Sequence, residues 1–176
     1  ENVPPESLNI TNPQIIKDIH KSYINSGSKF ITTNTFGANR YKLGHYNMQE
    51  ELKSFCTSGI QIAKDAAGKD AYVAASIGPI GRLIEPLGDL PFNEAYDIFS
   101  EIVKVFDKAK PDVILIETMI DIQEARACAL AVKDNTDIPF IITMTFEGGR
   151  RTTTGTPPEA FAVIGEGLGA CAIGAN

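Results

Sequence analysis

The sequence has few residues of the kinds that bind metals or form disulfides. Its three cysteines, Cys56, Cys128 and Cys171, lie far apart, and His20 and His45 form no pair at a metal-binding spacing. An odd number of widely spaced cysteines does not make a disulfide framework, so a reducing, cytoplasmic location is expected. Without a CxxC or HxxxH motif, none of these residues is predicted to bind a metal.

Long apolar runs and clusters of positive charge are also missing. The longest apolar runs, such as 113–116 and 140–142, are far shorter than the roughly 20 residues that span a bilayer. The formal net charge is −6, and the only adjacent basic pair is Arg150-Arg151. We therefore expect neither a membrane nor a nucleic acid as a partner. With 176 residues, of which 43% are hydrophobic, the chain suffices for one sizeable core.

Five short stretches have the composition of buried β-strands. They are near-continuous runs of apolar or β-branched residues rather than alternating ones, a pattern typical of parallel strands covered on both faces. The predicted strands are 29–34, 71–77, 113–117, 140–145 and 171–176.

Amphipathic helices are predicted before and between these strands. The first follows Thr11-Asn12-Pro13, a cap with a proline in the first turn, and carries an apolar stripe over residues 15–24. Two more are predicted over 51–67 and from residue 93 onward. The last two helix starts have the spacing of a capping box: Asp121 with Glu124, and Thr156 with Glu159.

This order of elements fits two α/β architectures, an open doubly wound sheet and a (β/α)8 TIM barrel. A complete barrel usually needs about 250 residues, whereas this chain predicts about five of the eight strands. The chain opens on a helix with no strand before it and stops on a strand with no helix after it. We therefore favour one partial domain, 1–176, a barrel truncated at both ends that lacks its first strand and its last two.

In both architectures ligands bind at the carboxyl ends of the strands. Glu117 is the most informative residue there, because a carboxylate that directly follows the apolar run 113–116 needs a partner. It can hold a substrate ammonium group or act as a general base. A structural ion pair with a neighbouring loop is the alternative.

Polar residues and glycines also follow the first two predicted strands. Asn34 carries an amide that both donates and accepts, and Thr35 comes next. The turn 76–81 begins with Ser76 and contains Gly78, and its backbone N–H groups could approach a ligand. Loop capping by Asn34 and a plain tight turn at 76–81 remain open alternatives. The residues alone predict a small polar, amino-bearing ligand on an α/β enzyme scaffold.

Six segments distributed over the chain form an ordered set with a familiar spacing. They are 8–13 (LNITNP), 33–40 (TNTFGANR), 75–79 (ASIGP), 116–119 (IETM), 143–146 (TMTF) and 154–156 (TGT). Together they resemble the homocysteine S-methyltransferase family, and within it the N-terminal homocysteine module of cobalamin-dependent methionine synthases.

The resemblance implies a (β/α)8 barrel that transfers a methyl group to the thiol of homocysteine and forms methionine. It implies that Glu117 binds the amino group of homocysteine. The other residues expected to bind the substrate are Asn34, Thr35, Ser76 and Gly78. No catalytic residue is identified in this chain.

The same resemblance implies a zinc ion, held by three cysteines, that activates the homocysteine thiol. One ligand follows a Gly-x-Asn at the end of the sixth strand, which 174–176 matches, and two more follow the eighth strand. All three are expected beyond Asn176. The family's opening Gly-Asp-Gly segment, whose aspartate would share the amino group with Glu117, is not found either. The chain alone is therefore expected to be inactive and only marginally stable.

The methyl donor is expected to be methylcobalamin on another domain, so cobalamin- and folate-binding domains of a longer methionine synthase are the expected partners. Gly37 stands where betaine-using relatives carry a bulky aromatic residue, which disfavours betaine. A methyltransferase that uses S-methylmethionine, one fused to a folate reductase, and a non-catalytic binding fragment are the alternatives. An unrelated barrel enzyme such as an aldolase would need a strand-end lysine or a phosphate-binding loop, and neither is seen.

Overall fold

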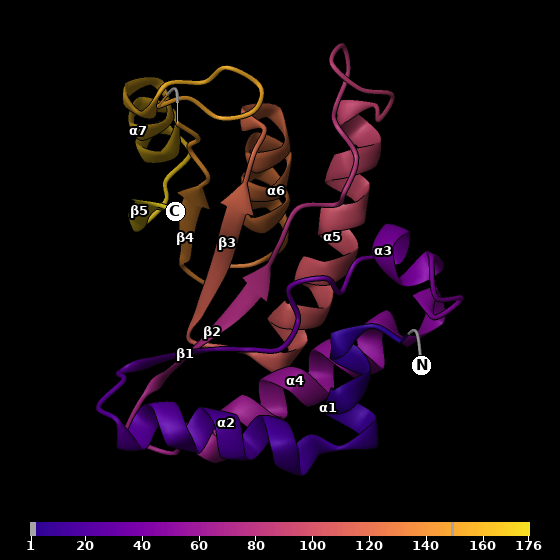
Figure 1. The fold of residues 1–176 in the computed structure, drawn as a ribbon, viewed down its shortest axis with the longest axis vertical. Helices are drawn as coiled ribbons and strands as arrows, with labels where there is room; N and C mark the ends of the chain where they lie inside the picture. The colour runs from indigo at the N-terminus through magenta and orange to yellow at the C-terminus, as the bar shows by residue number, and fades with distance from the viewer. Residues whose placement is uncertain (1–2, 149) are drawn as a thin grey trace.

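The computed structural model describes residues 3–148 and 150–176, in which strands and helices largely alternate (Figure 1). The strands are β1 (Phe30–Thr32), β2 (Tyr72–Ile77), β3 (Val113–Met119), β4 (Phe140–Met144) and β5 (Ala172–Ala175). The α-helices are α1 (Leu8–Thr11), α2 (Pro13–Asn25), α3 (Arg40–Gly44), α4 (Leu52–Ala67), α5 (Phe92–Ala109), α6 (Ile122–Asn135) and α7 (Pro158–Gly167). Two 3-10 turns, η1 (Pro5–Ser7) and η2 (Gln49–Glu51), complete the set in these residues.

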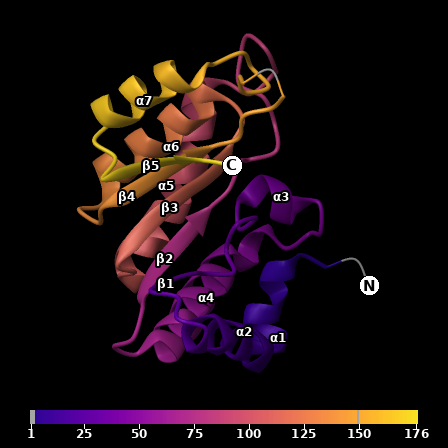
Figure 2. The same ribbon diagram turned by 60° about the vertical axis from the view of Figure 1, so that its left-hand side comes forward.

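The five strands form one parallel sheet in the order β1-β2-β3-β4-β5. In a doubly wound sheet the strand order reverses at a switch point, and no reversal occurs here. Sequential parallel strands with right-handed crossovers instead carry their helices on one face, as in a β/α barrel. In Figure 2 the strands succeed one another from β1 to β5, with α2 and α4 beside β1 and α7 beside β5. The predicted α/β barrel section, with five strands, is confirmed.

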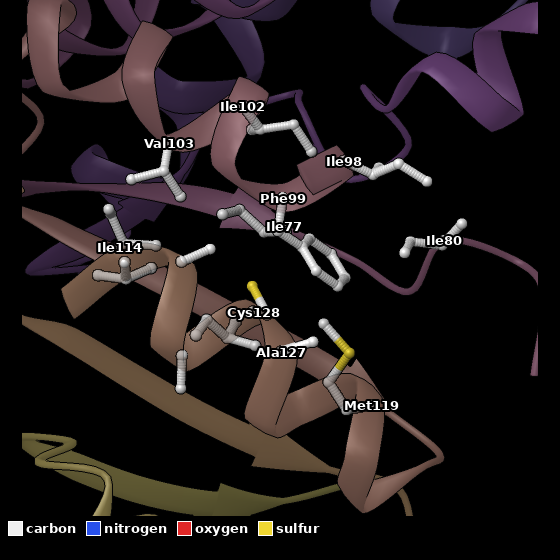
Figure 3. Packing of buried hydrophobic residues seen from close by; sticks show 14 of the residues in the cluster. Ile77, Ile80, Ile98, Phe99, Ile102, Val103, Ile114, Met119, Ala127 and Cys128 are labelled. Carbon is white, nitrogen blue, oxygen red and sulfur yellow. The ribbon is translucent and has the colours of Figure 1, made fainter. Parts of the chain in front are cut away.

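The helix-covered face of the sheet holds the core. From α5, Phe99 and Val103 project toward Ile114 of β3 and Cys128 of α6 (Figure 3). All four side chains are fully or almost fully buried. Close packing of this kind, rather than any single contact, provides most of the stability of such a domain. Cys128 packs in this core as a small hydrophobic residue.

The opposite face of β1 and of the start of β2 is open, which corrects the expectation of strands covered on both faces. Ile31 and Val73 pack beneath α4, but Phe30 and Tyr72 point the other way and are 54% and 58% exposed. Their rings lie 5.2 Å apart. In a closed barrel this face lines the interior, so its apolar character suits a barrel and not the surface of an open sheet.

A groove of about 540 Å³ separates α2 from the edge of β1. Ile19 and Tyr23 of the predicted apolar stripe line it and are exposed, whereas Ile16 is buried. His20 lies on the side of α2 that faces the groove and is only 5% exposed. Its burial lowers its pKa, and its Nε2 has no hydrogen-bond partner among the described residues.

Of the two predicted capping boxes, one is confirmed in part and the other is wrong. Asp121 caps α6, since its Oδ1 accepts a hydrogen bond of 2.9 Å from the backbone N–H of Gln123. Glu124, however, does not bond back to Asp121. The box at Thr156 is wrong: Pro157 is the N-cap residue of α7 and makes no side-chain capping bond. In the described part of the chain, no helix combines the length and the apolarity needed to cross a membrane.

Candidate functional site

The carboxyl ends of the strands meet at one edge of the sheet, where the arrowheads of β2, β3 and β4 point in Figure 1. Neighbouring strands pair in parallel, with Ser76 of β2 level with Leu115 of β3. This register brings side chains from segments far apart in the sequence to the same edge. It is the edge at which β/α barrels bind their ligands.

Ser76 and Glu117 form the centre of this edge. The hydroxyl of Ser76 donates a hydrogen bond of 2.5 Å to Oε1 of Glu117. Ser76 is fully buried, while Glu117 is half-buried, so the carboxylate is oriented from below and still reaches the open face. The salt bridges found among the described residues do not include Glu117. The arrangement presents an anionic oxygen pair that can accept hydrogen bonds from a ligand cation.

Thr118, which sequence reasoning did not single out, has a strained backbone. Its φ of 63° lies in the left-handed region, an outlier for a β-branched residue. The pairing of β3 with β4 shifts register between Ile116 and Met119 at the same point. Two polar contacts hold Thr118: its N–H donates to Oγ1 of Thr143 (3.2 Å), and its Oγ1 accepts from Nδ2 of Asn176 (3.1 Å). Backbone strain of this kind costs about 1–3 kcal/mol and clusters at functional sites.

Thr35 lies behind the site and not in it. Its hydroxyl donates to the backbone carbonyl of Ser76 (2.8 Å) and lies 2.7 Å from the hydroxyl of Thr33. Thr33 Oγ1 in turn accepts from the N–H of Ser76 (3.1 Å). Both threonines are buried, so they join the end of β1 to β2 and fix the backbone of Ser76. A contact between Thr35 and a ligand remains a prediction that this placement does not support.

Asn34 turns away from Ser76 and Glu117. Its Nδ2 donates to the carbonyl of Pro5 (2.9 Å) and to Oδ1 of Asn9 (3.0 Å), and Asn9 donates back to the carbonyl of Asn34 (2.8 Å). The amide thus attaches the N-terminal segment to the end of β1. The structure does not bring Asn34 together with the other predicted site residues.

Gly78 is next to the site, and its lack of a side chain has a steric reason. A Cβ at this position would lie 2.5 Å from the ring of Phe36. The N–H of Gly78 donates to the carbonyl of Phe36 (3.0 Å). This N–H was expected to face a ligand, and it is instead used to join the β1 and β2 loops.

Two buried carboxylates near these loops escaped the sequence reasoning. Oε1 of Glu6 accepts a hydrogen bond of 2.6 Å from the N–H of Gly37, and Oε1 of Glu124 accepts one of 2.6 Å from the N–H of Ile80. Burial raises the pKa of Glu124 to about 7. The available signal for Glu124 was a glutamate in the first turn of a helix that continues with alanines at 125, 127 and 129, and the capping-box prediction had already given it a partner.

The cysteines do not fit a zinc site. Cys56 and Cys128 are buried in the core, and burial raises the pKa of both thiols, which opposes the thiolate that binds zinc. Cys171 is exposed but precedes β5, at the end of the strand remote from Glu117. Within residues 3–148 and 150–176, no three His, Cys, Asp or Glu side chains gather closely enough to hold a metal. No step of the chemistry is therefore assigned to zinc bound by these residues.

The burial of the thiols predicts their reactivity. In the native protein a maleimide is expected to modify Cys171 rapidly, while Cys56 and Cys128 react only after denaturation, because only an accessible thiolate attacks. Intact mass measured over time, with Cys171→Ser as the control, checks this. Native labelling of Cys171→Ser at the wild-type rate would contradict the packing described above.

The sequence matches one known protein family over almost its whole length. The model of the homocysteine S-methyltransferase family matches residues 4–176. The chain belongs to this family. The methionine synthases of Mycobacterium leprae and Mycobacterium tuberculosis are 28% and 29% identical to it over 182 aligned residues. Both alignments cover 97% of the chain but only 15% of the synthase.

Solved structures show the same fold for this homocysteine S-methyltransferase domain. The metallated form of the homocysteine methyltransferase MmuM from Escherichia coli superposes with a TM-score of 0.85 at 18% identity. That match covers 97% of the present chain and 65% of MmuM. The apo form of MmuM gives a TM-score of 0.80 at the same identity and coverage of 65%. The chain thus spans less than two thirds of these relatives.

Proposed function

We propose that this domain binds homocysteine for methyl transfer to its thiol, forming methionine, as part of a longer methionine synthase. Membership of the family and the similarity to two methionine synthases support the reaction. The observation that carries the proposal is the Ser76–Glu117 pair at the strand ends. It presents a half-buried carboxylate, already oriented, to a ligand that carries an ammonium group.

In the proposed reaction, the residues at this edge of the sheet serve to position the substrate. Glu117 accepts hydrogen bonds from the ammonium group of homocysteine, and Ser76 keeps the carboxylate in position. The thiol releases its proton to solvent, and its sulfur then forms a bond to the methyl carbon. The bond between that carbon and its donor breaks, and the electron pair stays with the donor. Ser76 and Glu117 act only on the amino end of the substrate.

We further propose that polypeptide outside these 176 residues closes the barrel. The open edge of β1, the groove beside α2 and the unpartnered Nε2 of His20 all suit an additional parallel strand. The zinc cysteines, and the domains that bring methylcobalamin and folate, would belong to the same longer protein. On this proposal the 176 residues alone bind homocysteine weakly and transfer no methyl group.

The test is methionine formation by the full-length protein. With zinc and homocysteine present, methylcobalamin, methyltetrahydrofolate and S-methylmethionine are offered in turn as donors, and methionine is measured by mass spectrometry. Methylcobalamin and methyltetrahydrofolate are expected to support turnover. Residues 1–176, assayed in parallel, are expected to give none. A full-length protein that loads zinc but makes no methionine from any donor would refute the proposal.

A further inference from the structure

The turn Gly78-Pro79-Ile80-Gly81, here called the β2 turn, directly follows β2 and starts two residues after Ser76. On one side it leans on the loop after β1. The N–H of Gly78 bonds to the carbonyl of Phe36, and the Phe36 ring covers Gly78 so closely that no Cβ would fit. Together with the hydrogen bonds that Ser76 makes with Thr33 and Thr35, the position of this turn therefore sets where the end of β2 can lie.

On its other side the β2 turn is held by Glu124 of α6. The N–H of Ile80 donates to Oε1 of Glu124 at 2.6 Å, across 44 residues of sequence. The side chain of Ile80 is fully buried in the same core as Ile98 (Figure 3). Glu124 thus fixes the backbone of a residue whose side chain is already anchored, which leaves the β2 turn little freedom.

A glutamate at position 124 costs folding free energy, because its carboxylate is buried, and packing alone does not explain its presence. It is 1% exposed, and burying a carboxylate without a paired cation is unfavourable. Desolvation, together with the nearby charge of Asp121, raises the pKa of Glu124 and outweighs the opposing effects of the Ile80 hydrogen bond and of Lys42. The N-terminus of α6 does not need it as a cap either, since Asp121 fills that role. What Glu124 adds is the connection to the β2 turn.

We propose that Glu124 is a positioning residue for homocysteine: by holding Ile80, it keeps Ser76 in register with Glu117. This inference rests on the proposed function. Release of the β2 turn would move the Ser76 hydroxyl, which lies 2.5 Å from Glu117, and would misplace the carboxylate that receives the ammonium group. Glu124 itself touches neither the substrate nor the reacting atoms.

The experiment compares three variants of the full-length protein: Glu124→Ala, Glu124→Gln and Asp121→Ala. Glutamine keeps an acceptor oxygen for Ile80, whereas alanine removes it. Asp121→Ala weakens the start of the same helix without touching the β2 turn. Three readouts are taken: KM and kcat for homocysteine, the dissociation constant of homocysteine from calorimetry, and amide hydrogen exchange at Ile80.

We expect Glu124→Ala to raise the KM and dissociation constant for homocysteine by about 10-fold or more, with a smaller effect on kcat. Exchange at Ile80 should accelerate in this variant. Glu124→Gln should stay within about threefold of the wild type, because the hydrogen bond can re-form. Asp121→Ala should lower the melting temperature and leave KM and the exchange at Ile80 unchanged.

Equal homocysteine affinity in Glu124→Ala and Asp121→Ala would overturn the positioning role and leave a purely structural one. Failure of the proposed function looks different. If the wild type binds homocysteine but forms no methionine, methyl transfer is refuted, while the ratio of dissociation constants still decides the role of Glu124. A wild type that does not bind homocysteine at all would overturn both proposals.

Discussion

Glu117→Gln is expected to weaken homocysteine binding by about 10- to 100-fold, the loss of roughly 1.5–3 kcal/mol that accompanies removal of a charge-assisted hydrogen bond. Glutamine preserves the shape of the side chain and can still accept from Ser76, but it has no negative charge to offer an ammonium group. Because the interaction is with the amino end of the substrate, the effect should fall mainly on KM. Calorimetry with the full-length protein measures it.

Two further variants test the same prediction. Ser76→Ala removes the hydroxyl that orients the carboxylate and should weaken binding by a smaller factor, about 3- to 10-fold. Glu159→Gln removes the same charge from the exposed start of α7 and should have no effect. If Glu117→Gln bound homocysteine as tightly as Glu159→Gln does, the assignment of the strand-end carboxylate to the amino group would be wrong.

Glu124→Gln is expected to change how stability depends on pH. Burial raises the pKa of Glu124 to about 7 in the folded protein, against 4.5 for an unperturbed glutamate. The folded state therefore binds more protons between these two values, so the stability from this group is complete below about pH 4.5 and is lost as the pH rises to 7. The wild type should lose about 3 kcal/mol of unfolding free energy over this window.

The measurement is urea unfolding of wild type and variant at pH values from 5 to 8, followed by circular dichroism. Glutamine does not titrate, so Glu124→Gln should gain stability relative to the wild type as the pH rises, with no further gain well above pH 7. The exposed control Glu159→Gln should keep a constant difference from the wild type. A pH-independent difference for Glu124→Gln would mean that Glu124 is charged throughout, and that its burial is compensated by a partner.

The repeating units of the fold were predictable because the apolar pattern of each strand and helix lies within its own short stretch of sequence. The apolar runs at 113–117 and 140–145 correspond to β3 and β4, and the amphipathic pattern from residue 93 corresponds to α5. What surrounds an element was less predictable. The periodicity of apolar residues predicted the apolar stripe of α2. It could not predict whether another segment packs on Ile19 and Tyr23, because that depends on parts of the chain remote in sequence.

The candidate site could be predicted from the sequence where the type of residue and its position in a strand indicate the same role. A carboxylate after a buried strand indicated Glu117, and the strand-end rule then brought Ser76 to it. A ligand contact of Asn34 stays a prediction: its amide could bond to a ligand or to a backbone segment equally well, and in the structure it bonds to Asn9. Glu124 failed for a related reason: spacing suggested a partner three residues away, while the real partner is 44 residues away. The left-handed backbone conformation of Thr118 could not be predicted, because the pattern of side chains carries no signal for it.

The sequential strand order also bears on how this domain is made. Among the described strands, each one after β1 pairs with the strand that precedes it in the chain, so it finds its partner already synthesised. Sheets built from such near-neighbour contacts form faster than those that depend on distant pairing. On a ribosome the sheet can grow from β1 toward β5, and Ser76 meets Glu117 as soon as β3 emerges. The Ser76–Glu117 hydrogen bond, which carries the proposed function, can therefore form before β4 and β5 join the sheet.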